Sequence, residues 1–216
     1  MRNKISTLTW RPAWQQDGVE IKKNSLIYHG AYELTQLQLR HRYFSGEWSP
    51  WLTREYIKRA DAVAVLLWDA PTDQFILVEQ FRVGPLFAAS SASPWLLEVV
   101  AGLLEPNEEI EGALRRETEE EAGCAIHQLF KIGHCYNSPG GFAEKTFLFF
   151  GIIEALPITM IKGIEAEHED IRVHVLPTTN VLEALEKGEL LTSATTVIAL
   201  QWFQLNKQRL YDAKNL

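Results

Sequence analysis

The sequence predicts an α/β protein, an α/β/α sandwich around a mixed β-sheet, with a small antiparallel β-sheet domain in front of it. Short apolar strands alternate with helical patterns from about residue 60 onward, which is typical of a sheet covered by helices on both faces. Earlier residues contain strand patterns only, and a composition shift follows Arg59. We therefore predict two domains, over residues 1–58 and residues 59–216.

The composition is that of a soluble globular protein and argues against nucleic-acid-binding, secreted and membrane-spanning classes. The 216 residues are 46% hydrophobic and 23% charged, which is ordinary for a soluble globular chain. The net charge of -7, without a basic stripe, argues against a nucleic-acid partner. The first residues lack the apolar stretch of a signal peptide, and the longest apolar run, over 147–153, is too short to span a membrane. The two cysteines, Cys124 and Cys135, suit a reducing cytoplasm, so we expect a cytoplasmic protein without a membrane partner.

The first domain is predicted to contain three strands after an irregular arm over residues 1–17. They cover residues 19–28, 31–44 and 48–57, and the turn signals His29-Gly30 and Ser45-Gly46 separate them. A sheet of this size is marginally stable alone. We therefore expect it to pack against another domain or another subunit.

The second domain is predicted to alternate strands, loops and helices. Nearly continuous apolar runs indicate covered strands at 62–69 and 75–81. The remaining strands are expected at 95–100, 128–136, 145–153 and 171–176. Helical spacing predicts helices at 179–187 and 193–210, and turn-rich or acidic composition predicts loops at 84–93 and 157–170.

The segment 101–124 predicts a glycine turn, a polar loop, one helix and a glycine stop. Glu108 is expected to open the helix, where an acidic side chain suits the positive end of the dipole. Gly123 is expected to end it in the left-handed conformation.

One face of this helix changes from apolar to acidic along its length. At about 100° per residue, that face carries Ile110, Ala113, Leu114, Glu117, Glu120 and Glu121. The opposite face carries spaced charges that suit solvent-exposed ion pairs: Glu111, Arg115 and Glu119. Inward carboxylates are costly unless positive charge meets them, and Arg116 alone cannot neutralise three. Clustered oxygen ligands therefore predict a Mg²⁺ or Mn²⁺ site.

The spacing of these residues resembles the Nudix box. The box reads Gly, five residues, Glu, seven residues, Arg-Glu, two residues, Glu-Glu, one residue, Gly, and is filled here by Gly102, Glu108, Arg116, Glu117, Glu120, Glu121 and Gly123. The resemblance covers about residues 60–210 and implies hydrolysis of the pyrophosphate in a nucleoside diphosphate linked to another group. It implies as metal ligands Glu117, Glu120, Glu121 and the backbone carbonyl of Ala101. It gives Arg116 a catalytic role in pairing with Glu108 and orienting a ligand carboxylate.

A closer resemblance, to the bacterial ADP-ribose pyrophosphatase subfamily, is carried by four segments. They are SPWLLE at 93–98, SPGG at 138–141, EHEDIRVHV at 167–175 and ALQW at 199–202. Pro139 also stands fifteen residues past Cys124, a spacing that marks the subfamily. The resemblance implies Mg²⁺-dependent hydrolysis of ADP-ribose to AMP and ribose 5-phosphate. It further implies a homodimer whose exchanged N-terminal strands reach the partner's active site.

The same resemblance implies further site residues. Glu167 falls at the general base and Glu169 at a further metal ligand. Substrate contacts fall on Ala31, Tyr32, Arg54, Glu55, Arg82, Leu103, Ser138, Gly140 and Glu144, the first two from the partner subunit. Ala31 stands where an aromatic residue is expected, so adenine stacking would fall to Tyr32.

Several alternatives remain open from the sequence. The substrate could be GDP-mannose or another nucleotide sugar, and a Nudix domain that only binds ADP-ribose is a different class of protein. Glu169 or Glu120 are the alternatives to Glu167 as general base. The acidic loop at 157–170 could instead be a solvated surface loop, and Tyr32 could serve only sheet packing.

Overall fold

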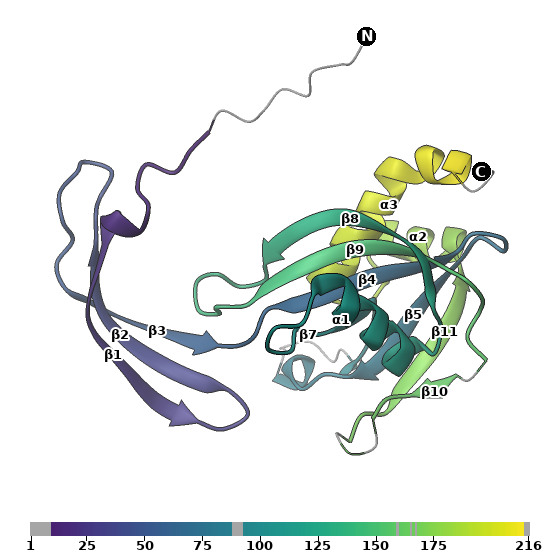
Figure 1. Cartoon of the computed structure of the whole chain (residues 1–216), viewed down its shortest axis with the longest axis horizontal. Coiled ribbons are helices and arrows are strands. Elements are labelled where there is room, and N and C mark those ends of the chain that lie inside the picture. Colours follow the sequence, from purple (N-terminus) through teal and green to yellow (C-terminus); the bar gives the residue numbers. More distant parts are fainter. Residues whose placement is uncertain (1–9, 88–92, 159, 165, 167, 214–216) are drawn as a thin grey trace, which may run out of the picture. The chain divides into compact units, whose positions relative to one another are not determined.

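The computed structural model describes residues 10–87, 93–158, 160–164, 166 and 168–213 (Figure 1). The chain divides into two compact units. Unit 1 comprises Met1–Arg59 and Gly140–Ala143, and unit 2 comprises Ala60–Pro139 and Glu144–Leu216. The short segment Gly140–Ala143 lies far along the chain from the rest of unit 1, and no sequence pattern marked it as part of that unit.

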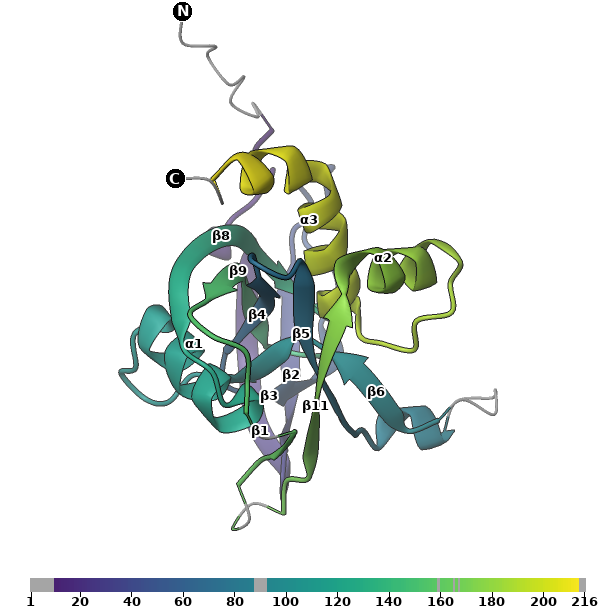
Figure 2. The same cartoon turned by 90° about the vertical axis from the view of Figure 1, so that its right-hand side faces the viewer.

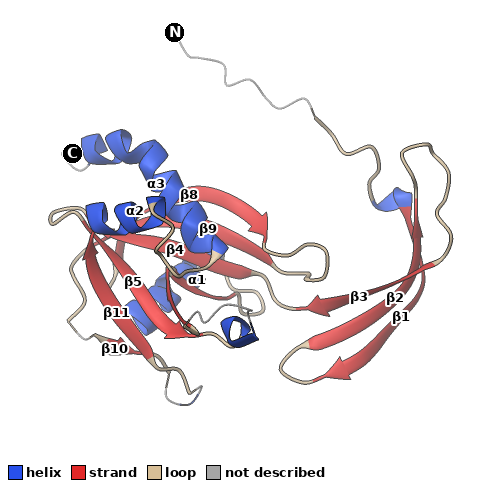
Figure 3. Ribbon diagram, turned by 180° about the vertical axis from the view of Figure 1, so that it is seen from behind, coloured by secondary structure: helices blue, strands red, loops and turns tan. Residues whose placement is uncertain are grey.

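Unit 1 is a three-stranded antiparallel sheet in the order β1-β2-β3, which confirms the predicted small sheet (Figure 3). Its strands are β1 (Val19–His29), β2 (Glu33–His41) and β3 (Leu52–Lys58). The second and third strands are shorter than predicted because residues 42–51 form a turn-rich connection in which Gly46 has φ 93°. The segment Gly140–Ala143 pairs with β3 through the Ile57 backbone, whose N–H donates to the Gly141 oxygen at 2.7 Å.

The sheet of unit 1 exposes much of its apolar surface. Ile21, Leu26, Ile27 and Tyr28 on β1 are all exposed, and the described residues of unit 1 contain no α-helix to cover them. The connection after β2 is held by cation–π contacts, with the Arg42 guanidinium 4.2 Å from the Trp48 ring centre.

Unit 2 contains a mixed sheet, as predicted. The strand order is β10-β11-β5-β4-β9-β8, with β6 paired to β5 and β7 paired to β4. The pairing of β4 with β9 is parallel and the other pairings are antiparallel. The strands are β4 (Ala62–Asp69), β5 (Gln74–Phe81), β6 (Trp95–Glu98), β7 (Val100–Leu103), β8 (Ile126–Tyr136), β9 (Lys145–Ile153), β10 (Ile161–Lys162) and β11 (Ile171–Pro177).

Helices cover both faces of this sheet, as Figure 2 shows. They are α1 (Ile110–Glu117), α2 (Thr178–Glu186) and α3 (Ala194–Ala213). Alternate residues of β4 supply two cores: Val63 and Val65 pack with Leu114 of α1, whereas Leu66 and Trp68 pack with α2 and α3. None of the helices in the described part of the chain is long and apolar enough to cross a membrane.

Three local predictions were wrong in detail. The box helix begins at Ile110 rather than at Glu108, whose carboxylate instead accepts the Glu105 N–H at 3.0 Å. The strand expected at 95–100 is two short strands, β6 and β7, which pair with different neighbours. A two-residue strand, β10, lies within the loop predicted at 157–170. The predicted glycine stop is confirmed, since Gly123 has φ 65°.

Candidate active site

The acidic end of the box helix is held against the sheet by its apolar start. Ala113 and Leu114 are buried against β4, and a π-helical turn over Thr118–Ala122 then continues α1. Thr118 anchors this turn, because its buried hydroxyl donates to the Leu114 carbonyl at 2.7 Å. A π-turn shifts the rotation of the following side chains, and here it carries Glu120 and Glu121.

Arg116 is the centre of the carboxylate cluster. Its Nε and Nη2 donate to the two oxygens of Glu108, each at 2.9 Å. Its Nη1 donates to Glu117 at 2.8 Å and to Glu120 at 3.0 Å. The Arg116 guanidinium lowers the pKa of Glu108 to about 2, and its bonds, to Glu108 first, raise its own pKa. One cation therefore meets three carboxylates, those of Glu108, Glu117 and Glu120, and makes no bond to Glu121 among the contacts described.

Glu121 is the most buried member of the cluster, with only 4% of its surface exposed. One oxygen accepts the Ala101 backbone N–H at 3.0 Å, and the other lies 3.5 Å from the Gln80 amide nitrogen. Burial, together with the charges of Glu117 and Glu169, raises the pKa of Glu121 to about 8 despite the opposing Ala101 hydrogen bond. The charge of Arg82 opposes this rise only in part.

Glu117 lies directly over Gly102 of β7. A Cβ placed on Gly102 would stand 1.8 Å from the Glu117 Oε1 atom, so only glycine fits beneath this carboxylate. Burial raises the pKa of Glu117, and the bond from Arg116 opposes that effect. The glycine that opens the box therefore has a steric role, which is to admit a carboxylate against the strand.

The donor chemistry of this cluster fits a divalent cation. Glu117, Glu120 and Glu121 offer oxygen atoms only, and burial together with mutual repulsion raises the pKa of Glu117 and of Glu121. Within the described ranges, no three His, Cys, Asp or Glu side chains are already arranged around one ion position. Arg116 Nη1 occupies the place between Glu117 and Glu120, so these hydrogen bonds and a bound cation compete for the same oxygens.

The acidic loop reaches the cluster through Glu169. The charge of Glu169 contributes to the raised pKa of both Glu117 and Glu121, so its carboxylate lies within electrostatic range of the box. Its backbone N–H donates to the Ile164 carbonyl at 3.3 Å. Glu167, the predicted general base, lies outside the described residues.

Four of the predicted substrate residues belong to unit 2. Arg82 donates to the buried Glu98 at 2.7 Å, and its charge also acts on Glu121. The Leu103 carbonyl accepts from Arg116 Nη2 at 3.3 Å. Glu144 is buried and accepts from the Asn137 amide at 2.9 Å, beside Ser138 in the β8–β9 turn. Arg82 and Leu103 thus adjoin the carboxylate cluster.

Register places Glu144 at the same end of the sheet as Leu103. Ala62 of β4 pairs with Leu103 on one side and with Thr146 on the other. Glu144 stands two residues before Thr146. It therefore lies near the N-terminal end of β4, where the loop of the box follows Leu103 of β7.

The other predicted substrate residues belong to unit 1. Tyr32 is exposed and its ring lies 5.5 Å from the Arg59 guanidinium carbon. Arg54 and Glu55 lie on β3, where Glu55 accepts from the Gln36 amide at 3.1 Å. Ala31 lies in the turn between β1 and β2, and Gly140 begins the segment that joins β3.

Two residues that contact the site were missed by the sequence analysis. Gln80 interrupts the buried apolar run of β5 and faces Glu121, and Glu98 is buried on β6 as the partner of Arg82. A polar residue at an inward position of an apolar strand was the signal for both.

Known proteins resemble this chain over most of its length. A family model described as NUDIX domain matches residues 58–207. An ADP-ribose pyrophosphatase of Haemophilus influenzae is 37% identical over 201 residues, which is 93% of this chain and 92% of that protein. One of Escherichia coli (strain K12) is 37% identical over 195 residues, covering 90% and 92% of the two chains.

The chain also resembles a relative with a different named substrate and a solved structure. A GDP-mannose pyrophosphatase of Yersinia pestis is 33% identical over 154 residues, covering 71% of this chain and 75% of that protein. The crystal structure of an ADP compounds hydrolase superposes with a TM-score of 0.66 at 18% identity, covering 89% and 96% of the chains, which supports the fold. The box residues gathered around Arg116, together with a match that spans most of the chain, show that this protein belongs to the Nudix family.

Proposed function

We propose that the protein hydrolyses ADP-ribose, or a close ADP-sugar, to AMP and ribose 5-phosphate in a Mg²⁺-dependent reaction. The observation that carries the proposal is the cluster of inward carboxylates around the single cation Arg116. A pyrophosphate diester is dianionic, so attack by water requires its charge to be neutralised and the water to be positioned. The 37% identity to two ADP-ribose pyrophosphatases supports the choice of substrate.

The cation is proposed to be held by oxygen ligands from the box and the acidic loop: Glu117, Glu120, Glu121, Glu169 and the Ala101 carbonyl. Mg²⁺ is the proposed ion and Mn²⁺ the alternative, since both prefer such ligands. When bound, the ion would neutralise phosphate charge and lower the pKa of coordinated water.

The residues of the chain supply orientation and proton transfer. Arg116 stays bound to Glu108 through Nε and Nη2 and so orients the neighbouring carboxylates. Glu167 is proposed to take the proton of the attacking water while an oxygen–phosphorus bond forms and the bridging phosphorus–oxygen bond breaks. Attack at either phosphorus gives the same two products.

Substrate recognition is proposed to use both units. Arg82 would bind a phosphate, and Arg54 and Tyr32 would stack on adenine. The remaining contacts would come from Ala31, Glu55, Leu103, Ser138, Gly140 and Glu144. Since Cys124 and Cys135 are both free thiols, we place the reaction in the cytoplasm.

A substrate panel tests the activity. Purified protein is incubated with Mg²⁺ and ADP-ribose, ADP-glucose, GDP-mannose or diadenosine polyphosphates, and the products are identified. We expect AMP and ribose 5-phosphate from ADP-ribose at the highest kcat/KM. GDP-mannose is the second candidate because the Yersinia pestis relative bears that name, and turnover of GDP-mannose alone would overturn the ADP-ribose assignment. Binding of ADP-ribose without turnover would indicate a sensor.

The protein is further proposed to be a homodimer in which unit 1 of one chain completes the active site of its partner. The exposed apolar side chains of β1 support this proposal, because surfaces of this kind mark interaction sites. Mixing two inactive variants tests it. Glu117→Gln disables the box and Tyr32→Ala disables the contact that unit 1 is proposed to make with the partner's site. Random exchange should restore about a quarter of wild-type activity if each site uses two chains. No restoration after verified subunit exchange would mean that each site is built from one chain.

A further inference from the structure

The strand β11 carries the acidic loop at its start. Glu169 stands two residues before Ile171, the first residue of β11. Ile171 and Val173 are buried in the α1-side core, whereas Arg172 and His174 alternate with them and face the other side of the sheet. The position of Glu169 therefore depends on how the first residues of β11 are attached.

Glu79 of β5 makes that attachment through its side chain. It pairs with Arg172 in the antiparallel ladder. Its Oε2 accepts a hydrogen bond from His174 Nε2 at 2.8 Å and lies 3.9 Å from Arg172 Nη1. One carboxylate thus holds the two polar side chains at the start of β11.

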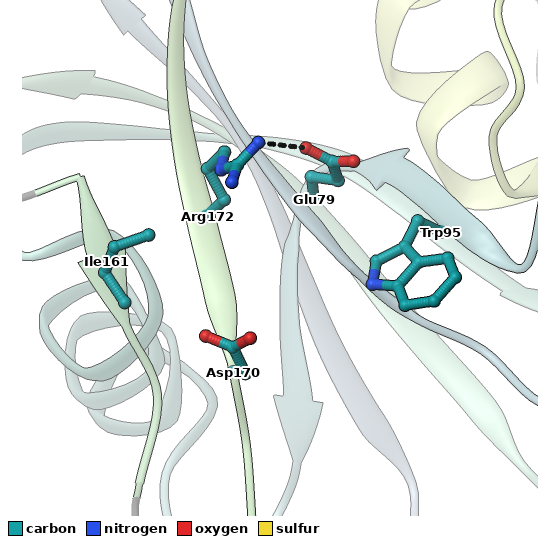
Figure 4. Close-up of a pocket in the computed structure, with 5 residues that line it drawn as sticks. All are labelled: Glu79, Trp95, Ile161, Asp170 and Arg172. Carbon is teal, nitrogen blue, oxygen red and sulfur yellow. Dashed lines mark ion pairs between the residues drawn. The ribbon is translucent and has the colours of Figure 1, made fainter.

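Apolar packing on this face is incomplete. A cavity of about 270 Å³ lies beside Glu79. It is lined by Glu79, Trp95, Ile161, Asp170 and Arg172, which Figure 4 shows. Arg172 and Asp170 border this hollow instead of a packed layer, so β11 is attached here by its backbone ladder and by the polar contacts of Glu79.

The loop is also tied together at its base. Ile161 and Lys162 of β10 pair with Arg172 and Ile171. Gly163, with φ 105°, packs so closely on the Glu169 backbone that a Cβ there would stand 2.6 Å from the Glu169 carbonyl oxygen. Because β10 pairs with Arg172 and Gly163 packs on Glu169, we expect the position of Glu169 to follow that of Arg172.

The neighbouring residue on β5 contacts the other side of the carboxylate cluster. Gln80 faces the α1 side and lies 3.5 Å from Glu121, while Glu79 faces the opposite side and holds β11. Two consecutive residues of one strand thus connect the box to the strand that follows Glu169.

We propose that Glu79 is a positioning residue for the hydrolysis: by holding His174 and Arg172 it sets where Glu169 meets the box carboxylates. The proposal rests on the proposed function and on Glu169 as a cation ligand. Glu79 itself touches neither substrate nor cation, and it acts through the start of β11.

Kinetics of three variants test the proposal. In Glu79→Ala the attachment is lost, and we expect a fall in kcat and a rise in the Mg²⁺ concentration for half-maximal activity, each of about 10-fold, as for outer-sphere residues of metal sites. KM for ADP-ribose should stay within about two-fold, since no substrate contact changes. Glu79→Gln keeps an oxygen that accepts from His174 and should retain most of the activity. Glu183→Ala removes the carboxylate of an exposed 2.6 Å ion pair with Lys187 on α2 and is the matched control.

A double-mutant cycle decides whether Glu79 acts through Glu169. If it does, Glu79→Ala should change kcat by less than about two-fold in a Glu169→Ala background. An equal loss in both backgrounds would overturn the proposal, because Glu79 would then act on the protein as a whole. Loss of folding in Glu79→Ala would shift the cycle to His174→Leu, which removes the hydrogen bond to Glu79 from the other side.

Two measurements do not depend on turnover. Mn²⁺ binding to the free protein, followed by electron paramagnetic resonance, should weaken by about 10-fold in Glu79→Ala and stay unchanged in Glu183→Ala. Amide hydrogen exchange should accelerate at Glu169 and over residues 171–176 of β11, with α1 unchanged. Unchanged exchange in β11 would contradict the positioning role even if ADP-ribose were not the substrate. Absence of ADP-ribose turnover in the wild type would contradict only the proposed function.

Discussion

The two sheets of this chain contain similar strand-forming residues and differ in what covers them. The strand β4 is buried on both faces, because α1 covers one side and α3 the other. In unit 1 the strand β1 contains both apolar and polar residues, and both kinds are mostly exposed. An apolar pattern therefore predicts which side chains would be buried. Their burial itself requires a second layer of structure that packs against the strand. In unit 2 that layer is part of the same unit, and for unit 1 we propose a second chain.

The largest expected effect is a loss of catalytic activity in unit 2, from a substitution that leaves the fold of both sheets unchanged. Glu117→Gln keeps the shape of the side chain over Gly102 and removes the charge of a proposed cation ligand. We expect kcat to fall by at least ~10³-fold, or about 4 kcal/mol. Glu119→Gln is the matched control, since Glu119 belongs to the same turn and is exposed. Steady-state kinetics at saturating Mg²⁺ measure both, and equal losses would remove the distinction between the two faces of the helix.

The next effect compares one aromatic residue from each unit, Phe203 on α3 and Phe44 in the connection between β2 and β3. Phe203 is fully buried and contacts Phe75, Phe150 and Trp68, whereas Phe44 in unit 1 is 93% exposed. Phe203→Ala should lower the free energy of unfolding by about 3–5 kcal/mol. Phe44→Ala should change it by less than ~0.5 kcal/mol. Urea denaturation measures both values, and a large loss from Phe44→Ala would show that this ring is covered in solution.

A third effect tests close packing at the site itself. Gly102→Ala places a methyl group where the Glu117 carboxylate lies, so the carboxylate must move. A misplacement of this size should lower kcat by about 10²-fold. Gly112→Ala is the control, because nothing lies within 4 Å of a Cβ on Gly112 of α1. That substitution should raise stability by about 0.5–1 kcal/mol. Full activity in Gly102→Ala would mean that the position of Glu117 is not critical.

Local patterns predicted the layered fold and the carboxylate cluster well, for a physical reason. Apolar runs record strands that are covered on both faces, which located β4 and β5, and helical periodicity records the buried face of α1. The spacing of Glu117, Glu120 and Glu121 likewise records one helical face, which Arg116 confirms by contacting two of them.

Contacts between distant segments could not be read in the same way. The bond of His174 to Glu79 joins residues 95 positions apart, and only strand order and register bring them together. The same holds for Gly140–Ala143, which pairs with β3 although it lies far from β3 in the sequence. The split of the segment 95–103 into β6 and β7 depends on two different neighbours, β5 and β4, which no local pattern encodes.

The smallest effect concerns the contact between α3 and the turn that joins β4 to β5. The Tyr211 hydroxyl of α3 donates to Asp73, which also accepts from the Trp68 indole at 3.1 Å. Burial, and then the bond to Asp73, raise the pKa of Tyr211 to about 12, from an ordinary value of 10.0. Because the folded protein holds this proton more tightly, the stabilisation is complete below pH ~10 and is lost as the pH rises toward ~12.

Tyr211→Phe removes that bond and the ionisable group together. We expect a loss of about 1 kcal/mol of unfolding free energy at neutral pH. Between pH ~10 and ~12 the difference between the variant and the wild type should shrink, since the wild type loses its advantage as Tyr211 ionises. Urea denaturation at a series of pH values measures this trend. A constant difference across the alkaline range would mean that Tyr211 packs as a plain aromatic ring, and that α3 covers the sheet by apolar contacts alone.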